Sequence, residues 1–95
     1  MIRSFQGQLA EDLFLNRRSG VTKRFPAELF DVAQRKLQYL HSAARLDDLR
    51  RPPGNRLEAL RGKSKGKFSI RINDQWRVVF RWSDGASDVE VIDYH

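Results

Sequence analysis

The sequence lacks several features that would each point to a function. Its 95 residues include no cysteine, which excludes disulfides, thiolate metal sites and a cysteine nucleophile and is compatible with a reducing cytosol. The opening stretch MIRSFQGQLAEDLF is interrupted by Arg3, Glu11 and Asp12, so it has no signal-peptide core. No segment approaches the ~20 apolar residues of a membrane span. We therefore expect a cytoplasmic protein with no membrane contact.

Common phosphate-binding and metal-binding motifs are absent as well. The chain contains no GxxxxGK[ST], GxGxxG or HExxH pattern and has only two histidines. His41 has no second ligand at a recognisable spacing, and we interpret it as a surface or helix-flank residue. We therefore expect no metal and no cofactor. His95 is then the one acid–base candidate whose side chain titrates near neutral pH.

Positive charge is what the chain has in abundance. Eighteen Lys and Arg residues against twelve Asp and Glu give a net charge of +6. Between residues 50 and 81 there are ten basic residues, and the acidic ones are only Glu58 and Asp74. A basic field this concentrated is typical of proteins that bind a polyphosphate such as nucleic acid. The alternative is a solvated basic surface that keeps the protein soluble.

The apolar pattern predicts helices first and strands afterwards. IRSF is a candidate opening strand, and apolar residues three and four apart predict helices over residues 9–14 and 29–44. After Pro52, Pro53 and Gly54 the period changes to two, over residues 68–72, 76–82 and 89–94. The turns Asn73-Asp74 and Asp84-Gly85 favour an antiparallel meander. We predict one α+β domain over residues 1–95, with helices packed on one face of the sheet.

Two features of this arrangement concern charge. The segment NRRSGVTKRF (residues 16–25) has like charges and a glycine without apolar periodicity, and is interpreted as a mobile connector whose charge could also contact nucleic acid. In the strands, Arg71, Arg77 and Arg81 alternate with the apolar residues and should lie on the face away from the helices. Guanidinium groups held by rigid strands can bind phosphate bidentately with little loss of entropy.

The residues also offer an inventory for metal-free RNA cleavage. That reaction needs a base for the ribose 2′-OH, cations for the phosphorane and an acid for the leaving 5′-oxygen. The candidates are His95, Asp93, Tyr94, Arg77 and Arg61. Strand spacing sends Asp93 and His95 to one face and Tyr94 to the other. From the residues alone, both a nuclease and a simple nucleic-acid-binding module remain open.

Three blocks of the sequence are similar to a known family. MIRSF, RLEALRGKSKGKFSIRINDQWRVVFRW and VEVIDYH resemble the HigB killer proteins, which are toxins of type II toxin–antitoxin modules with the RelE-like fold. The resemblance spans nearly the whole chain and is weakest around Ser19. It implies an N-terminal strand and two to three helices on a curved antiparallel sheet. It also implies a ribosome-dependent, metal-independent endoribonuclease that cuts messenger RNA and inhibits translation.

The resemblance implies partners and site residues too. The partners would be a helix-turn-helix antitoxin (HigA-like) and the ribosome with its messenger RNA, with operator DNA bound only through the antitoxin complex. The terminal motif falls on Asp93, Tyr94 and His95, with the histidine as the main proton-transfer group. Arg77 is suited to the scissile phosphate, and Arg61 is the basic residue before the glycine turn.

This chain departs from the family pattern at two positions. Many members have lysine where this chain has Arg61, and because arginine cannot give up a proton, Arg61 is an electrostatic clamp. Many have histidine where this chain has Glu58. A carboxylate there could act as a base, or could be structurally neutral in a salt bridge to a nearby arginine. Both departures place the proton transfer on His95, with Asp93, Glu58 or Tyr94 as its partner.

Further basic residues are candidates for contact with ribosomal RNA. They are Lys63, Lys65, Lys67, Arg71 and Arg81, with Arg35, Lys36, Arg17 and Arg24 as weaker candidates. The preferred interpretation is a translation-inhibiting endoribonuclease. The main alternative is a non-catalytic toxin of the same fold that binds and inhibits DNA gyrase. A plain nucleic-acid-binding module accounts for the charge but not for the terminal Asp-Tyr-His.

Overall fold

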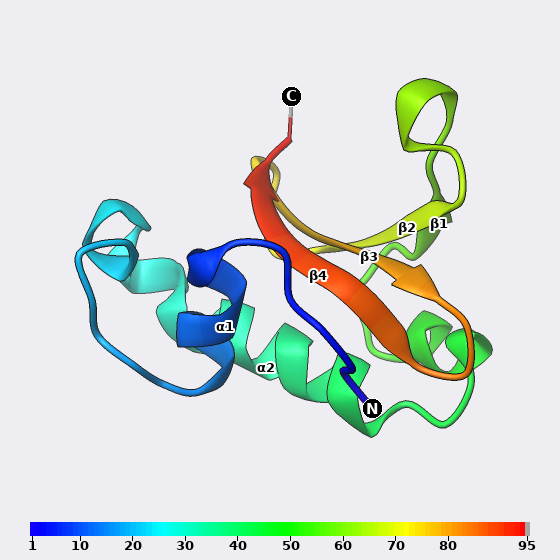
Figure 1. The fold of residues 1–95 in the computed structure, drawn as a ribbon, viewed down its shortest axis with the longest axis horizontal. Coiled ribbons are helices and arrows are strands. Elements are labelled where there is room, and N and C mark those ends of the chain that lie inside the picture. The colour runs from blue at the N-terminus through cyan, green and yellow to red at the C-terminus, as the bar shows by residue number, and fades with distance from the viewer. Residues whose placement is uncertain (95) are drawn as a thin grey trace.

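A computed structural model describes residues 1–94, and Figure 1 shows how its elements are arranged. The α-helices are α1 (Gln8–Phe14) and α2 (Phe30–Ser42). The strands are β1 (Glu58–Ala59), β2 (Lys67–Arg71), β3 (Trp76–Trp82) and β4 (Ala86–Asp93). The short 3-10 helices are η1 (Thr22–Arg24), η2 (Ala27–Leu29), η3 (Leu46–Arg50) and η4 (Gly62–Ser64). No helix in this part of the chain is long and apolar enough to cross a membrane.

The strands form one antiparallel sheet in the order β1-β2-β3-β4, which confirms the predicted meander. Both α-helices lie on one side of this sheet, and the sheet curves visibly along β3 and β4 (Figure 1). The register of β3 and β4 shifts between Val79 and Arg81, where β4 contains one extra residue. Such a bulge increases twist and bends the strand. The α+β class predicted from the sequence is confirmed.

The N-terminal segment runs beside β4 instead of forming a full strand. It pairs in parallel through two isolated bridges, Ile2 with Ala86 and Phe5 with Val89. The backbone N–H of Ile2 donates to Nδ1 of His41 at 3.1 Å, and the His41 ring packs against Phe14 with centroids 5.1 Å apart. His41 therefore ties the start of the chain to α2, as befits a helix-flank residue.

The core lies between the helices and one face of the sheet. The apolar stripe of α2 is completely or almost completely buried at Phe30, Ala33, Leu37 and Leu40. Opposite it, alternate residues of the strands are also fully buried: Ile70, Val78, Phe80 and Val89. Burying each large side chain stabilises the fold by roughly 1.5–3 kcal/mol, so this pattern fixes which face of each strand points inward.

The other face of the sheet, called here the open face, carries the charged residues of the strands together with Val79 and Ile92. Strand pairing places Glu58 opposite Ser69, Arg71 opposite Arg77, and Lys67 opposite Arg81. Because side chains alternate along a strand, all of these point away from the helices. The core therefore determines the orientation of the charged side chains on the opposite side.

Residues 16–25, called here the basic loop, differ from their prediction. The sequence favoured a mobile connector, but the loop includes η1 and is tied to α1. The backbone N–H of Arg17 donates to the carbonyl of Asp12 at 2.8 Å, and the Ser19 hydroxyl donates to the Asp12 carboxylate at 2.7 Å. The sequence pattern misses this because the anchoring carboxylate belongs to the preceding helix.

Candidate active site

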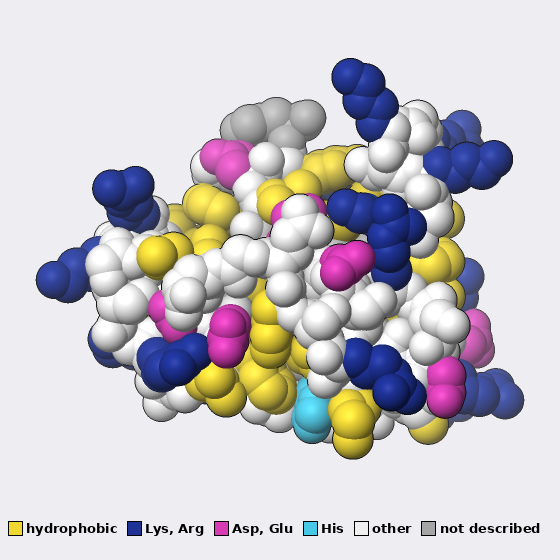
Figure 2. Space-filling model, in the orientation of Figure 1, with side chains coloured by type: hydrophobic (Ala, Val, Ile, Leu, Met, Phe, Trp, Pro, Cys, Tyr) yellow, Lys and Arg dark blue, Asp and Glu magenta, His cyan; other side chains and the backbone are white. Residues whose placement is uncertain are grey.

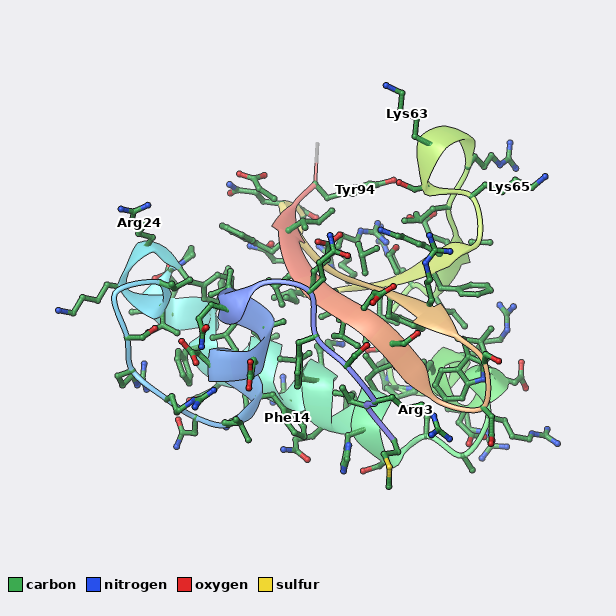
Figure 3. The ribbon with its side chains drawn as sticks, in the orientation of Figure 1. Arg3, Phe14, Arg24, Lys63, Lys65 and Tyr94 are labelled. Atoms are coloured by element: carbon green, nitrogen blue, oxygen red, sulfur yellow. The ribbon has the colours of Figure 1, made fainter. Side chains whose placement is uncertain are left out.

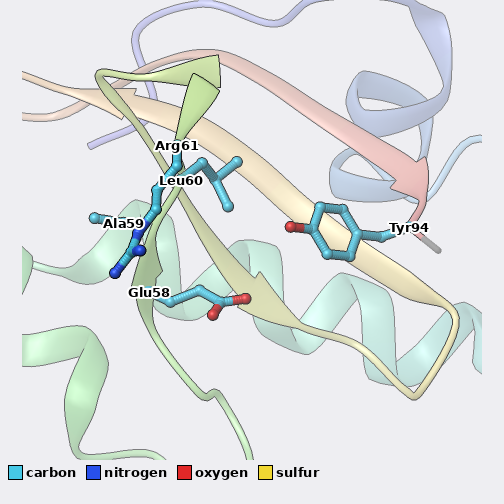
Figure 4. Close-up of a pocket in the computed structure, with 5 residues that line it drawn as sticks. All are labelled: Glu58, Ala59, Leu60, Arg61 and Tyr94. Carbon is cyan, nitrogen blue, oxygen red and sulfur yellow. The ribbon is translucent and has the colours of Figure 1, made fainter. Parts of the chain in front are cut away.

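A cavity of about 640 Å³ opens above the open face of the sheet. It is lined by Glu58, Ala59, Leu60 and Arg61 on one side and by Tyr94 on the other. β1 and β4 are opposite edges of the sheet, so the curvature of the sheet brings these two sides together. Figure 4 shows the Tyr94 ring reaching toward Leu60, with the Glu58 side chain beside it. The cavity therefore joins residues that are more than thirty positions apart in sequence.

Arg77 lies between two residues that line this cavity. Its Nη1 is 2.9 Å from Oε1 of Glu58 and donates to the hydroxyl of Ser69 at 3.1 Å. The Tyr94 ring lies over the guanidinium, 5.3 Å from centroid to Cζ. The Arg77 side chain is only 15% exposed, whereas that of Glu58 is 48% exposed. The guanidinium is thus held in one orientation before any ligand binds.

The hydrogen-bonding capacity of Arg77 is only partly used. Within residues 1–94, Nη1 makes both polar contacts, and Nε and Nη2 have no acceptor. These two nitrogens form one edge of the planar fork that matches a carboxylate or a phosphate. The arrangement can therefore bind an anion with little further loss of side-chain entropy.

Arg61 is at the mouth of the cavity, where β1 ends. It directly precedes η4, and the turn there requires Gly62, whose φ is +64°. Arg61 is exposed and makes no ion pair with any residue in 1–94. A second cation is therefore available beside the cavity.

The chain end separates the predicted Asp-Tyr-His motif. The Tyr94 backbone N–H donates to the carbonyl of Gln75 at 2.6 Å, and the Gln75 side-chain amide donates to Asp93 at 2.8 Å. Asp93 is paired with Trp76, whose ring packs against Phe25 in the core. Asp93 therefore belongs to the opposite face from Arg77, while Tyr94 lines the cavity. His95 lies outside the described residues.

The predicted RNA-binding cations of the sheet are each paired with a carboxylate. Arg71 pairs with Asp74. Nζ of Lys67 lies 3.9 Å from Oε1 of Glu90, and Nε of Arg81 lies 3.6 Å from Oδ2 of Asp88. Like charges directly opposite each other destabilise a sheet, and Arg71 faces Arg77 while Lys67 faces Arg81. The carboxylates offset this repulsion. These cations therefore have a structural role that the sequence pattern does not reveal.

Lys63 and Lys65 are different because they project from the turn that carries η4. This turn, residues 61–66, is called here the lysine turn, and it stands out from the body of the molecule (Figures 1 and 3). Both lysines are exposed and make no ion pair with any residue in the described chain. They are free to contact a phosphate backbone.

The structure contradicts one RNA-binding candidate. Lys36, a predicted contact for ribosomal RNA, is only 6% exposed, and its Nζ donates to Oδ1 of Asn55 at 2.6 Å. Burial lowers the pKa of the Lys36 ammonium, and the charges of Arg35 and Arg71 lower it further. Lys36 therefore holds the segment before β1 to α2. Arg35, its neighbour, is exposed.

Sequence reasoning missed two residues that position the site. Ser69 is fully buried and accepts the Arg77 hydrogen bond, and Gln75 holds both Asp93 and Tyr94. Strand alternation places Ser69 on the same face as Arg71, so that residue could have been found. Gln75 is an ordinary turn residue in the sequence and carries no such signal.

Helices on one face of a short antiparallel meander, with an anchored arginine on the other, place the molecule in the class of RelE-like folds. A solved structure of a YafQ mutant from E. coli matches with a TM-score of 0.59 at 20% identity, covering 98% of this chain and 91% of that one. A YoeB/ParE toxin from Agrobacterium tumefaciens matches with a TM-score of 0.51 at 20% identity, covering 98% and 99%. At this identity the likeness shows the fold alone.

The sequence gives the particular family. The family model for the RelE-like toxin of the type II toxin–antitoxin system HigB matches residues 4–95, and the chain belongs to this family. Toxin HigB-1 of Vibrio cholerae is 44% identical over 70 residues, 74% of each chain. Endoribonuclease HigB of Proteus vulgaris is 32% identical over 96 residues, and the alignment covers the full length of both chains. The family resemblance expected from the sequence is confirmed.

Proposed function

We propose that this chain is an endoribonuclease that cuts messenger RNA on the ribosome by metal-independent acid–base catalysis. The observation that carries the proposal is the arrangement of Arg77, whose guanidinium is anchored on one edge and unengaged on the other. It lies beside a cavity that contains the carboxylate of Glu58. The name of the relative from Proteus vulgaris, an endoribonuclease, supports the same activity.

The scissile phosphate is assigned to Arg77. Its Nε and Nη2 donate to two phosphate oxygens while Nη1 stays bonded to Ser69. Charge that develops on the phosphorane then strengthens these hydrogen bonds in the transition state. Arg61, at the mouth of the cavity, binds the same or the adjacent phosphate as a second cation.

Proton transfer needs two further groups. We assign Glu58 as the base, because it is the one carboxylate that lines the cavity among the described residues. It takes the proton of the 2′-OH, and the 2′-oxygen bonds to phosphorus as the bond to the 5′-oxygen breaks. His95, which follows Tyr94 in the chain, gives a proton to the leaving 5′-oxygen. The products are a 2′,3′-cyclic phosphate and a 5′-hydroxyl.

Tyr94 and Asp93 have supporting roles in this proposal. The exposed Tyr94 ring lines the cavity and can stack on an unpaired base next to the cut. Asp93 is a positioning residue, because its hydrogen bond with Gln75 fixes the strand end from which Tyr94 and His95 extend. Asp93 does not enter the cavity.

The partners follow from the family and the charge. Membership of a type II toxin–antitoxin family implies an antitoxin, which we propose is a HigA-like helix-turn-helix protein that also carries the complex to operator DNA. Lys63 and Lys65 are proposed to contact ribosomal RNA, with Arg35 as a weaker candidate. Ribosomes and messenger RNA as partners place the toxin in the cytoplasm.

Brief induced expression, followed by mapping of new 5′ ends on messenger RNA, tests the activity. The unmodified chain should create new ends and arrest growth. His95→Gln should reduce cleavage by about 10²- to 10⁴-fold, because proton transfer contributes that much. Arg77→Ala should nearly abolish cleavage, whereas Arg81→Ala, on the same strand but paired with Asp88, should retain it. Cleavage untouched by His95→Gln and Arg77→Ala would refute the proposed chemistry.

Two comparisons test the finer claims. The same messenger RNA incubated with the purified chain should be cut only when ribosomes are present, and equal cutting of free RNA would contradict ribosome dependence. The alternative of a gyrase inhibitor predicts growth arrest without new 5′ ends, together with loss of DNA supercoiling activity in a purified gyrase assay. The nuclease proposal predicts that gyrase is unaffected.

A further inference from the structure

The basic loop is a built structure and not a flexible connector. Asp12, in α1, is only 2% exposed although it is charged. Its carboxylate accepts hydrogen bonds from Gln8 at 2.8 Å and Ser19 at 2.7 Å, and lies 3.1 Å from Nε of Arg17. These hydrogen bonds, above all that of Ser19, hold the pKa of Asp12 below its ordinary value of 3.8. The anchor is therefore ionised at neutral pH.

A second set of bonds closes the loop on itself. The backbone N–H of Ser19 donates to Oγ1 of Thr22 at 2.8 Å, and that of Thr22 donates to Oγ of Ser19 at 3.2 Å. The Thr22 hydroxyl in turn donates to the carbonyl of Ser19 at 3.1 Å, and Thr22 is only 6% exposed. Residues 19–22 are thus fixed to α1 through Asp12.

This fixed loop presents three cations that have no anionic partner. Arg18, Lys23 and Arg24 are exposed and make no ion pair with any residue in 1–94. The Arg18 guanidinium lies 3.5 Å from the centroid of the Phe30 ring, over a cavity of about 220 Å³ that also involves Lys23. Stacking on an aromatic ring restrains Arg18 while its N–H groups remain able to bind an anion.

The loop belongs to the helix layer and the candidate active site to the open face, but both lie toward the upper edge of the molecule in Figure 3. In Figure 3, Arg24 and Lys63 both point to the upper edge of the view, on either side of Tyr94. Figure 2 shows Lys and Arg side chains gathered at these two corners. The longest extent of the molecule is 31 Å, so both corners lie within reach of one folded RNA.

We propose that the basic loop is a second RNA-binding surface, in which Arg18, Lys23 and Arg24 contact phosphates of the RNA that the toxin engages. The inference rests on the proposed function, because it assumes RNA as the partner. RNA is favoured over a protein because a loop held to α1 presents three cations without an anionic partner, and because Arg18, stacked on Phe30, loses little entropy on binding phosphate. The phosphates belong to ribosomal RNA or to the messenger.

Salt-dependent binding tests the inference. The triple variant Arg18→Gln/Lys23→Gln/Arg24→Gln should bind purified ribosomes more weakly than the unmodified chain. The slope of log affinity against log salt should fall by about 2 to 3, because each lost phosphate contact removes about 0.7–0.9. The matched control Arg45→Gln/Arg50→Gln/Arg51→Gln removes the same amount of charge around η3. Its slope of log affinity against log salt should stay close to that of the unmodified chain. Equal slopes in the two triple variants would overturn the proposal.

Two arms identify the source of the phosphates. Binding is measured once with ribosomes that lack messenger RNA and once with a short single-stranded RNA. If the triple variant binds more weakly than the unmodified chain only to the ribosomes, the loop contacts ribosomal RNA. If it binds more weakly to the single-stranded RNA, the loop contacts the messenger. Loss in neither arm, with weaker binding to the antitoxin instead, overturns the proposal in favour of a protein-binding loop.

The variant Asp12→Asn distinguishes the effect of the loop's fixed geometry on RNA binding from the effect of the protein's net charge. It raises the net charge, so long-range attraction alone predicts tighter binding, whereas loss of the loop anchor predicts weaker binding. Ser19→Ala removes the same anchor without a change of charge and should weaken binding as well, which covers the case in which Asp12→Asn does not fold. Tighter binding by either variant would contradict the inference. In all these variants, new 5′ ends on messenger RNA report separately whether the proposed nuclease function stands.

Discussion

The open face of the sheet and the projecting basic segments use the same residue types in opposite ways. On the open face every cation has a carboxylate partner: Arg71 with Asp74, Arg77 with Glu58, Lys67 with Glu90 and Arg81 with Asp88. The lysine turn and the basic loop instead carry cations that make no ion pair within residues 1–94. They are Arg61, Lys63 and Lys65 in the turn, and Arg18, Lys23 and Arg24 in the loop. Positive net charge is therefore displayed at the margins, not on the sheet.

The difference separates two tasks. A cation held by carboxylate and hydroxyl groups has a fixed geometry but little attraction for distant phosphate, which suits chemistry at one bond. Unpaired cations attract RNA over a longer range, because no neighbouring carboxylate neutralises them. Variants of the open face should therefore change the rate of cleavage, whereas variants of Lys63, Lys65 and the basic loop should change affinity.

Loss of the carboxylate at the cavity should have the largest effect. Glu58→Gln keeps the shape of the side chain but removes the proposed base, so kcat should fall by about 10²- to 10⁴-fold with KM unchanged or lower. Single-turnover cleavage of ribosome-bound messenger RNA measures both constants. The matched control is Glu90→Gln, which removes a carboxylate from the same face but away from the cavity. A fall in affinity with kcat intact would place Glu58 outside the chemistry.

Replacement of the anchored Arg77 by lysine should cause the second-largest fall in the rate of cleavage. Arg77→Lys keeps the charge but loses the planar fork, so kcat should fall by about 10²- to 10³-fold. Arg81→Lys, which alters the pairing with Asp88, should change kcat less than threefold, an order-of-magnitude expectation for a surface pair. The assay is the same, with unfolding in urea as a check on stability. Equal rates for the two variants would remove the distinction between Arg77 and its neighbours.

The margins should respond in affinity instead of rate. Lys63→Gln/Lys65→Gln should weaken ribosome binding and lower the slope of log affinity against log salt by about 1.5, with kcat unchanged at saturation. Titration of the unmodified chain and the double variant at several salt concentrations measures the slope. A reduced kcat at saturating ribosomes would show that Lys63 or Lys65 takes part in catalysis.

The smallest effect concerns acid stability of the basic loop. The pKa of Asp12 is lower in the folded protein than in the unfolded chain, first because of the Ser19 hydrogen bond. Its contribution to stability is therefore present above the unfolded value of 3.8 and is lost as pH falls through the folded value. The difference in Tm between the unmodified chain and Asp12→Asn should be constant near neutral pH and shrink below pH 3.8. A difference that grows in acid would reverse the sign and contradict the anchor.

Local patterns were sufficient for the elements but not for every residue on them. The period-two alternation correctly separated the buried Val78 and Phe80 from Arg77 on the other face. The same reasoning failed at Lys36, because a polar residue at the edge of a helical stripe is buried when another segment, here the one containing Asn55, packs over it. The sequence pattern also failed at the basic loop. Asp12 anchors this loop, but a charged residue in a helix such as α1 is ordinarily expected at the surface.

The sequence by itself determined the α+β class, the meander, the family and the separation of Asp93 from Tyr94, because periodicity and turn residues are local properties of the chain. Only the tertiary structure decided that Glu58, Arg77 and Tyr94 meet at one cavity, since that depends on the curvature that brings the two edges of the sheet together. It also decided which cations are neutralised and which remain unpaired. Ion pairs such as Lys67 with Glu90 join residues distant in sequence, so no local pattern contains them.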